Sequence, residues 1–133
     1  MSSRFKVTFN DSEDLGFAKS AYTLGAISFD ELKEWIVFVI SEEEEVPSFF
    51  FDILDLKEAD RAELTKSRIY GGFSPHWSSD LDKQDALIGI SVLRGRHQAH
   101  GDYRKEILCI LERNPDVSLT FKRLFPFIDL PES

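Results

Sequence analysis

The strongest helical signal in the chain is the segment Ser28-Phe29-Asp30-Glu31-Leu32-Lys33-Glu34-Trp35-Ile36-Val37-Phe38-Val39-Ile40. It opens with a capping-box pattern, in which a serine hydroxyl and a glutamate three residues later each satisfy a backbone amide of the other. The apolar side chains that follow recur at helical spacing, at Phe29, Leu32, Trp35, Ile36, Val39 and Ile40. This pattern predicts an amphipathic helix. We expect the acidic run Glu42–Glu45 to end it, because negative charge is unfavourable at a helix C-terminus.

Helical signals continue on both sides of this segment. Ser12 is expected to begin a helix that stops near Gly25, and Pro47 to begin one carrying Phe49, Phe50, Ile53 and Leu54. Asp55 to Glu58 forms a cap pattern for a polar helix reaching about Arg68, and residues 69–79 form a long loop. Three more helices are predicted. The first begins at Ser79 with Asp82 and ends near Gly95, and the second is capped by Asp102 and stopped by Asn114-Pro115. The third carries Phe121, Leu124 and Phe125. Leu81 is assigned to the apolar set of the first of these and Tyr103 to that of the second.

These signals predict an all-α or mainly α fold, a compact bundle of six to seven short helices in one domain over residues 1–133. The alternation of Phe5, Val7 and Phe9 permits one short N-terminal strand, or equally an extended arm packed on helices. The expected core includes Trp35, Ile36, Val39, Ile107, Leu111 and Phe125.

Composition limits the class of protein. The 133 residues are 42% hydrophobic and include 12 phenylalanines, which is enough apolar material for one core. The longest apolar stretches are far shorter than the roughly 20 residues of a membrane span, and the N-terminus lacks a signal-peptide pattern. The single cysteine, Cys109, lies between Leu108 and Ile110 and is interpreted as a buried, reduced thiol. Together these features predict a cytoplasmic protein.

The net charge of −8 is unevenly distributed along the chain. Residues 1–65 carry 15 acidic and 6 basic side chains (6 − 15 = −9), and residues 66–133 carry 9 acidic and 10 basic ones (10 − 9 = +1). An acidic surface repels phosphate backbones and attracts basic proteins, so direct nucleic-acid binding is disfavoured. The alternative is that the acidity serves solubility alone.

The chain shows little that carries chemistry. It has no phosphate-binding glycine loop and no recognisable nucleophile motif. His97 and His100, with Asp102 following, could supply metal ligands, but the flanking Gly95 and Gly101 favour a loop with exposed histidines. Pairing of Cys109 with a histidine is the weaker reading of that thiol. We therefore expect no metal, no cofactor and no enzymatic activity.

Two features favour recognition. One is an acidic patch of Glu42, Glu43, Glu44, Glu45, Asp52, Asp55, Glu58, Asp60 and Glu63; the other is an aromatic loop with Tyr70, Phe73, His76 and Trp77. Aromatic side chains beside charged ones are typical of protein interfaces. Each feature also has a structural explanation, since acidic pairs commonly form a solvated face, and Phe73 and Trp77 could pin the loop to the core. His76 is more simply incidental.

The segment Tyr22–Trp35, a small turn followed by a capped helix with a tryptophan, resembles the opening of small acidic bacterial immunity proteins. These proteins belong to polymorphic toxin and contact-dependent growth inhibition systems. The resemblance covers about the first third of the chain, and immunity proteins span unrelated folds. It implies a cytoplasmic protein that binds a cognate toxin domain, in many cases a nuclease with a basic cleft, and blocks its active site. An adaptor or regulatory binding module is the alternative, followed by a nucleic-acid mimic, which the near-neutral second half disfavours. Neither nucleic acid nor a membrane is an expected direct partner, and the oligomeric state is left open.

Overall fold

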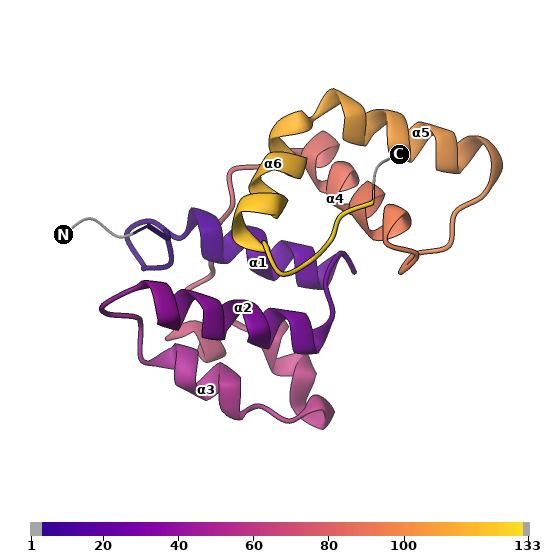
Figure 1. Cartoon of the computed structure of the whole chain (residues 1–133). Helices are drawn as coiled ribbons and strands as arrows, with labels where there is room; N and C mark the ends of the chain where they lie inside the picture. Colours follow the sequence, from indigo (N-terminus) through magenta and orange to yellow (C-terminus); the bar gives the residue numbers. More distant parts are fainter. Residues whose placement is uncertain (1–3, 132–133) are drawn as a thin grey trace. The chain divides into compact units, whose positions relative to one another are not determined.

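The computed structural model describes residues 4–131, which form two compact units. The first unit comprises residues 4–19 and 28–78, and the second comprises residues 20–27 and 79–131. Helix α1 (Glu13–Thr23) contributes to both. Within the described residues there are six α-helices, two 3₁₀-helices and no β-strand, so the predicted all-α fold is confirmed (Figure 1). The expectation of a single domain over residues 1–133 stays a prediction.

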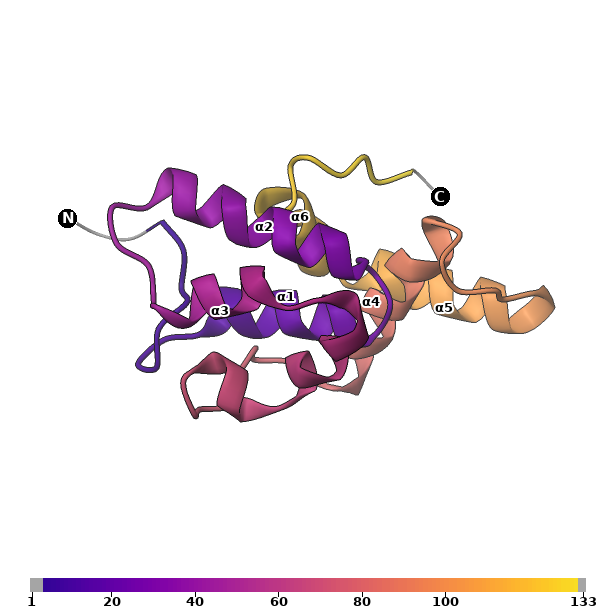
Figure 2. The ribbon, with the colours of Figure 1, turned by 90° about the horizontal axis from the view of Figure 1, so that it is seen from below.

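The first unit is built around α2 (Phe29–Glu42), which packs on α3 (Phe49–Asp55) (Figure 2). The predicted capping box is present: Ser28 Oγ accepts from Glu31 N at 3.1 Å, and Ser28 N donates to Glu31 Oε1 at 2.8 Å. The helix ends at Glu42, as expected. Its buried face comprises Phe29, Leu32, Trp35, Ile36 and Val39, as the spacing predicted, whereas Ile40, the last residue of the predicted stripe, is half-buried.

The polar segment after α3 departs from the prediction. Residues 58–70 form two 3₁₀-helices, η1 (Glu58–Thr65) and η2 (Ser67–Tyr70), where an α-helix was expected. Asp55 is the last residue of α3 and is not the predicted N-cap. The N-cap position of η1 is occupied by Lys57, whose side chain makes no capping hydrogen bond. Only Leu64 of η1 is buried. A stretch with one apolar anchor has no stripe to hold a regular α-helix against a core, which accounts for the tighter, less regular winding.

The N-terminal segment is an extended arm. Phe5 and Val7 are buried, whereas Phe9 is exposed. Thr8 and Asp11 form an isolated bridge, so no strand develops in this part of residues 4–131.

The second unit contains α4 (Leu81–Leu93), α5 (Gly101–Arg113) and α6 (Pro115–Leu124) (Figure 1). Helices α4 and α5 approach closely at Gly89, where an added Cβ would lie 3.1 Å from the carbonyl oxygen of Ile107. The turn that follows α1 is anchored here, since Gly25 O accepts from Ser91 Oγ at 2.9 Å and from Arg96 Nε at 2.8 Å. These side chains satisfy a backbone carbonyl of the turn, which lies beyond the end of α1.

Two predicted caps in this unit were displaced. Asp80, not Ser79, caps α4 by accepting from Lys83 N at 2.9 Å. His100 occupies the N-cap position of α5, and Asp102 lies in its first turn. Gly95 and Asn114-Pro115 mark helix ends as predicted.

All six predicted core residues are buried: Trp35, Ile36, Val39, Ile107, Leu111 and Phe125. The assignments of Leu81 and Tyr103 to apolar stripes were wrong, because both side chains are exposed. The interpretation of Cys109 as a buried thiol was also wrong. Ile107 and Leu111 set the buried face of α5, and Cys109, about 200° around the helix from each of them, faces solvent.

No helix within residues 4–131 combines the length and the apolarity that crossing a membrane requires.

Candidate functional site

One aromatic ring and two carboxylates lie on the exposed face of α3. Phe51, Asp52 and Asp55 are exposed, whereas Phe49, Phe50 and Ile53 are buried. At 100° per residue, Phe51, Asp55 and Asp52 fall within one arc of about 100°, and the three buried residues fall on the opposite side. We call Phe51, Asp52, Asp55 and the exposed Glu58, which follows at the start of η1, the α3 face.

The carboxylates of the α3 face form no ion pair with any side chain in the described part of the chain. Glu63, also on η1, differs: Arg68 donates hydrogen bonds to it, and with Lys66 nearby this lowers the pKa of Glu63 below its usual range. Cations of the same unit therefore pair with Glu63, whereas Asp52, Asp55 and Glu58 have no cation partner within residues 4–131.

The run Glu42–Glu45 divides into two residues that contact the N-terminal arm and two that face solvent. Arg4 Nη1 lies 2.9 Å from Glu42 Oε1, and Phe5 N donates to Glu43 Oε1 at 2.8 Å. These contacts hold the N-terminal arm, so Glu42 and Glu43 have structural roles within the first unit. Glu44 and Glu45 are exposed and make no ion pair within residues 4–131.

The aromatic loop is largely a structural element. Tyr70, predicted to contact a partner, is buried, and its hydroxyl donates to the carbonyl of Leu64. Phe73 is half-buried between two rings, with centroids 6.0 Å from Phe49 and 5.6 Å from Phe9. Recognition through Tyr70 is therefore wrong, because its ring and hydroxyl are both used inside the unit.

Trp77 pins the same loop to α1. Its ring lies 4.8 Å from that of Phe17 in an edge-to-face arrangement, and His76 N donates to Ser12 Oγ at 2.9 Å. The loop backbone passes over Gly16 so closely that an added Cβ would lie 2.3 Å from the carbonyl carbon of His76. Of the two explanations for Phe73 and Trp77, these contacts favour packing.

Comparison with known proteins gave no relative. No family model, no curated protein and no solved structure matched the chain.

The residues considered for chemistry are dispersed. His97 and His100 lie in the loop between α4 and α5, as expected, and both are exposed. His97 lies against the ring of Tyr103, with centroids 6.5 Å apart. Among residues 4–131, no group of three or more His, Cys, Asp or Glu side chains is arranged to hold a metal ion. The absence of a metal, a cofactor and a reaction stays a prediction.

Phe51 is the residue of the α3 face that the sequence analysis missed. It is 52% exposed, although it stands in a run of three phenylalanines that reads as core. The helical phase of its neighbours contains the signal. Once Phe50 and Ile53 are placed inward, Phe51 must point outward with Asp52 and Asp55.

Proposed function

We propose that this chain is an immunity-type protein that binds a basic toxin domain through the α3 face and thereby blocks the toxin. The observation that carries the proposal is the exposed Phe51 ring on the same side of α3 as Asp52 and Asp55, with the exposed Glu58 following at the start of η1; these three carboxylates have no counter-charge in the described residues. The resemblance of Tyr22–Trp35 to immunity proteins supplies the class of partner. The cytoplasm, where such proteins act, belongs to the same proposal.

Charge supports a basic partner. The first unit holds 15 acidic and 8 basic side chains (8 − 15 = −7), and the second holds 9 and 8 (8 − 9 = −1) when every residue of the sequence is counted. Nearly all of the net negative charge therefore belongs to the unit that carries the α3 face. Such a field accelerates encounter with a positively charged surface and opposes binding to phosphate backbones.

The chemistry of the α3 face suits a binding hot spot. A half-exposed phenylalanine offers apolar area at little conformational cost, and carboxylates around it can pair with arginine or lysine once water is excluded. We expect Phe51 to supply much of the affinity. Asp52 and Asp55 would supply orientation and discrimination, while Glu44 and Glu45 would mainly affect the association rate.

The test begins with the genes next to the one for this protein: a toxin domain encoded there is purified, its binding is measured by calorimetry across a salt series, and its activity is then assayed. Phe51→Ala should weaken binding by about 2 kcal/mol or more. Asp52→Asn and Asp55→Asn should each cost about 2–5 kcal/mol if they pair with buried cations of the toxin. Glu34→Gln is the matched control, because Glu34 is an exposed carboxylate on α2, outside the α3 face.

Two outcomes would sink the proposal. One is an affinity that responds neither to salt nor to substitutions on the α3 face. The other is a salt-dependent complex in which the toxin keeps full activity, which would make the protein an adaptor and not an inhibitor.

A further inference from the structure

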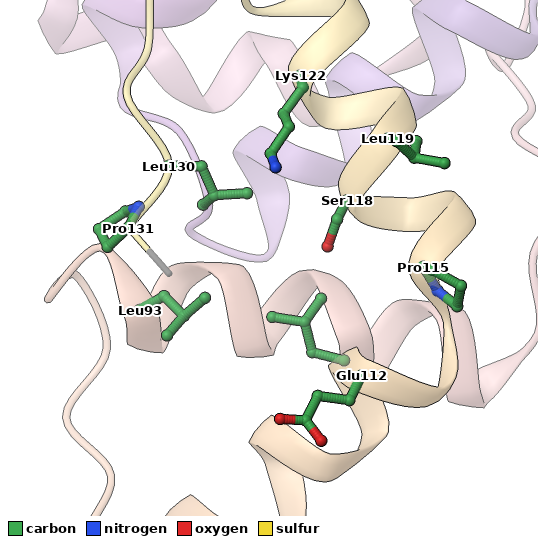
Figure 3. A pocket seen from close by; sticks show the side chains of 9 residues that line it. Leu93, Glu112, Pro115, Ser118, Leu119, Lys122, Leu130 and Pro131 are labelled. Atoms are coloured by element: carbon green, nitrogen blue, oxygen red, sulfur yellow. The ribbon is translucent and has the colours of Figure 1, made fainter. Parts of the chain in front are cut away.

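The second unit contains an open groove that is separate from the α3 face. Its volume is about 460 Å³, and its walls come from α4, α5, α6 and the segment after α6 (Figure 3). Six of the nine lining residues are leucines or prolines: Leu93, Leu111, Pro115, Leu119, Leu130 and Pro131. Leu119 is 67% exposed beside the groove, which leaves a large apolar side chain in water.

Two charges of opposite sign border this apolar surface. Glu112 on α5 and Lys122 on α6 lie on opposite sides of the groove, with the leucines between and around them (Figure 3). Both side chains are exposed, and neither forms an ion pair with another residue in the described range 4–131. The groove is thus bordered by one acid and one base, each without a counter-charge.

We infer that a second copy of this chain binds this groove and forms a two-fold symmetric dimer. In a two-fold interface the same surface meets itself, so a residue on one copy contacts a different residue on the other, and the reverse contact also forms. Opposite charges on the two sides of one groove match this requirement. Glu112 of each copy faces Lys122 of the other, and the exposed side chain of Leu119 is buried between the two copies.

Charge also argues against other occupants. A strongly basic partner would leave Lys122 facing like charge, and a strongly acidic one would leave Glu112 in the same position. A partner with one acid and one base around an apolar centre satisfies both residues, and a second copy supplies that arrangement from the same sequence. Because the groove is small, we expect a weak dimer with a dissociation constant on the order of 100 µM.

The experiment is sedimentation velocity on the intact chain, from about 10 µM to about 500 µM, so that the range brackets the expected dissociation constant. The unmodified protein should pass from monomer to dimer. Glu112→Lys and Lys122→Glu should each weaken the dimer by about tenfold or more, since each removes two attractive contacts and creates two repulsive ones. The double variant, which exchanges the charges, should return to within about threefold of the original.

Two leucine substitutions test the apolar part of the proposed interface. Leu119→Ala should weaken the dimer, whereas Leu81→Ala, which truncates an exposed leucine of α4 that does not line the groove, should not. A protein that stays monomeric at the highest concentration would overturn the inference. So would a dimer that none of the groove substitutions weakens, or one that the double exchange fails to restore. The substituted side chains are exposed, so the variants should fold.

Discussion

Gly16 allows the loop after η2 to lie directly on α1. An ideal Cβ at this position would be 2.3 Å from the carbonyl carbon of His76, 2.4 Å from the nitrogen of Trp77 and 2.7 Å from the carbonyl oxygen of His76. All three are backbone atoms, so no side-chain rotation relieves the overlap. Gly16→Ala must therefore push the loop away from the helix.

Three contributions determine the cost. Overpacking costs about 1–3 kcal/mol. Moving the loop also weakens the bonds that tie it to α1, His76 N to Ser12 Oγ at 2.9 Å and Ser78 N to Glu13 Oε2 at 2.7 Å, each contributing about 1 kcal/mol. Replacing glycine by alanine within a helix returns about 1 kcal/mol. The expected net loss is about 3 kcal/mol, or about 10 °C in the melting temperature of a chain of this length.

Thermal and urea unfolding followed by circular dichroism measure this loss. A double-mutant cycle with Trp77→Ala tests whether the loss of stability comes from the overlap with the loop, because loosening the loop should reduce the cost of Gly16→Ala. Ser20→Ala, a small substitution elsewhere on α1, should change stability by less than about 0.5 kcal/mol. If Gly16→Ala is neutral or stabilising, helix propensity dominates and the close approach does not constrain the loop. An equal cost in both backgrounds would place the strain elsewhere.

Three further predictions concern stability. Trp35→Ala should cost about 3–5 kcal/mol in urea unfolding, because the buried indole leaves a large cavity beside Phe50; a cost below 1 kcal/mol would mean that the core repacks. Glu43→Ala should cost about 1.5–3 kcal/mol through loss of the bond from Phe5 N, whereas the exposed Glu44→Ala should be near neutral; equal effects would contradict the anchoring role. The hydrogen bond from Asn114 and the charge of Arg113 lower the pKa of Asp82, so its contribution to stability is present above the unfolded pKa of about 3.9 and is lost as pH falls through the lower folded value. Asp82→Ala should therefore reduce the acid-induced loss of stability below about pH 4, and unchanged acid unfolding would refute this.

The elements that could be predicted from the sequence are those whose signals are local. The capping box at Ser28 and the apolar spacing through Val39 specify the start, length and buried face of α2, because a helix is stabilised by contacts three and four residues apart. The stop at Gly25 and the break at Asn114-Pro115 are local for the same reason. Phe51 was within reach of this reasoning, since its outward direction follows from the phase of α3.

The tertiary structure decided which polar and aromatic side chains remain available to a partner. Glu43 and Glu44 are adjacent and chemically identical, yet Glu43 holds the N-terminal arm and Glu44 faces water. The difference arises because folding brings Phe5, which is 38 residues from Glu43 along the chain, within hydrogen-bond distance of Glu43. Tyr70 belongs to a loop whose aromatic residues were expected to contact a partner, and only the packing of η1 and η2 buries its ring and directs its hydroxyl to Leu64. Such contacts depend on where distant segments meet after folding, and local spacing carries no information about that meeting.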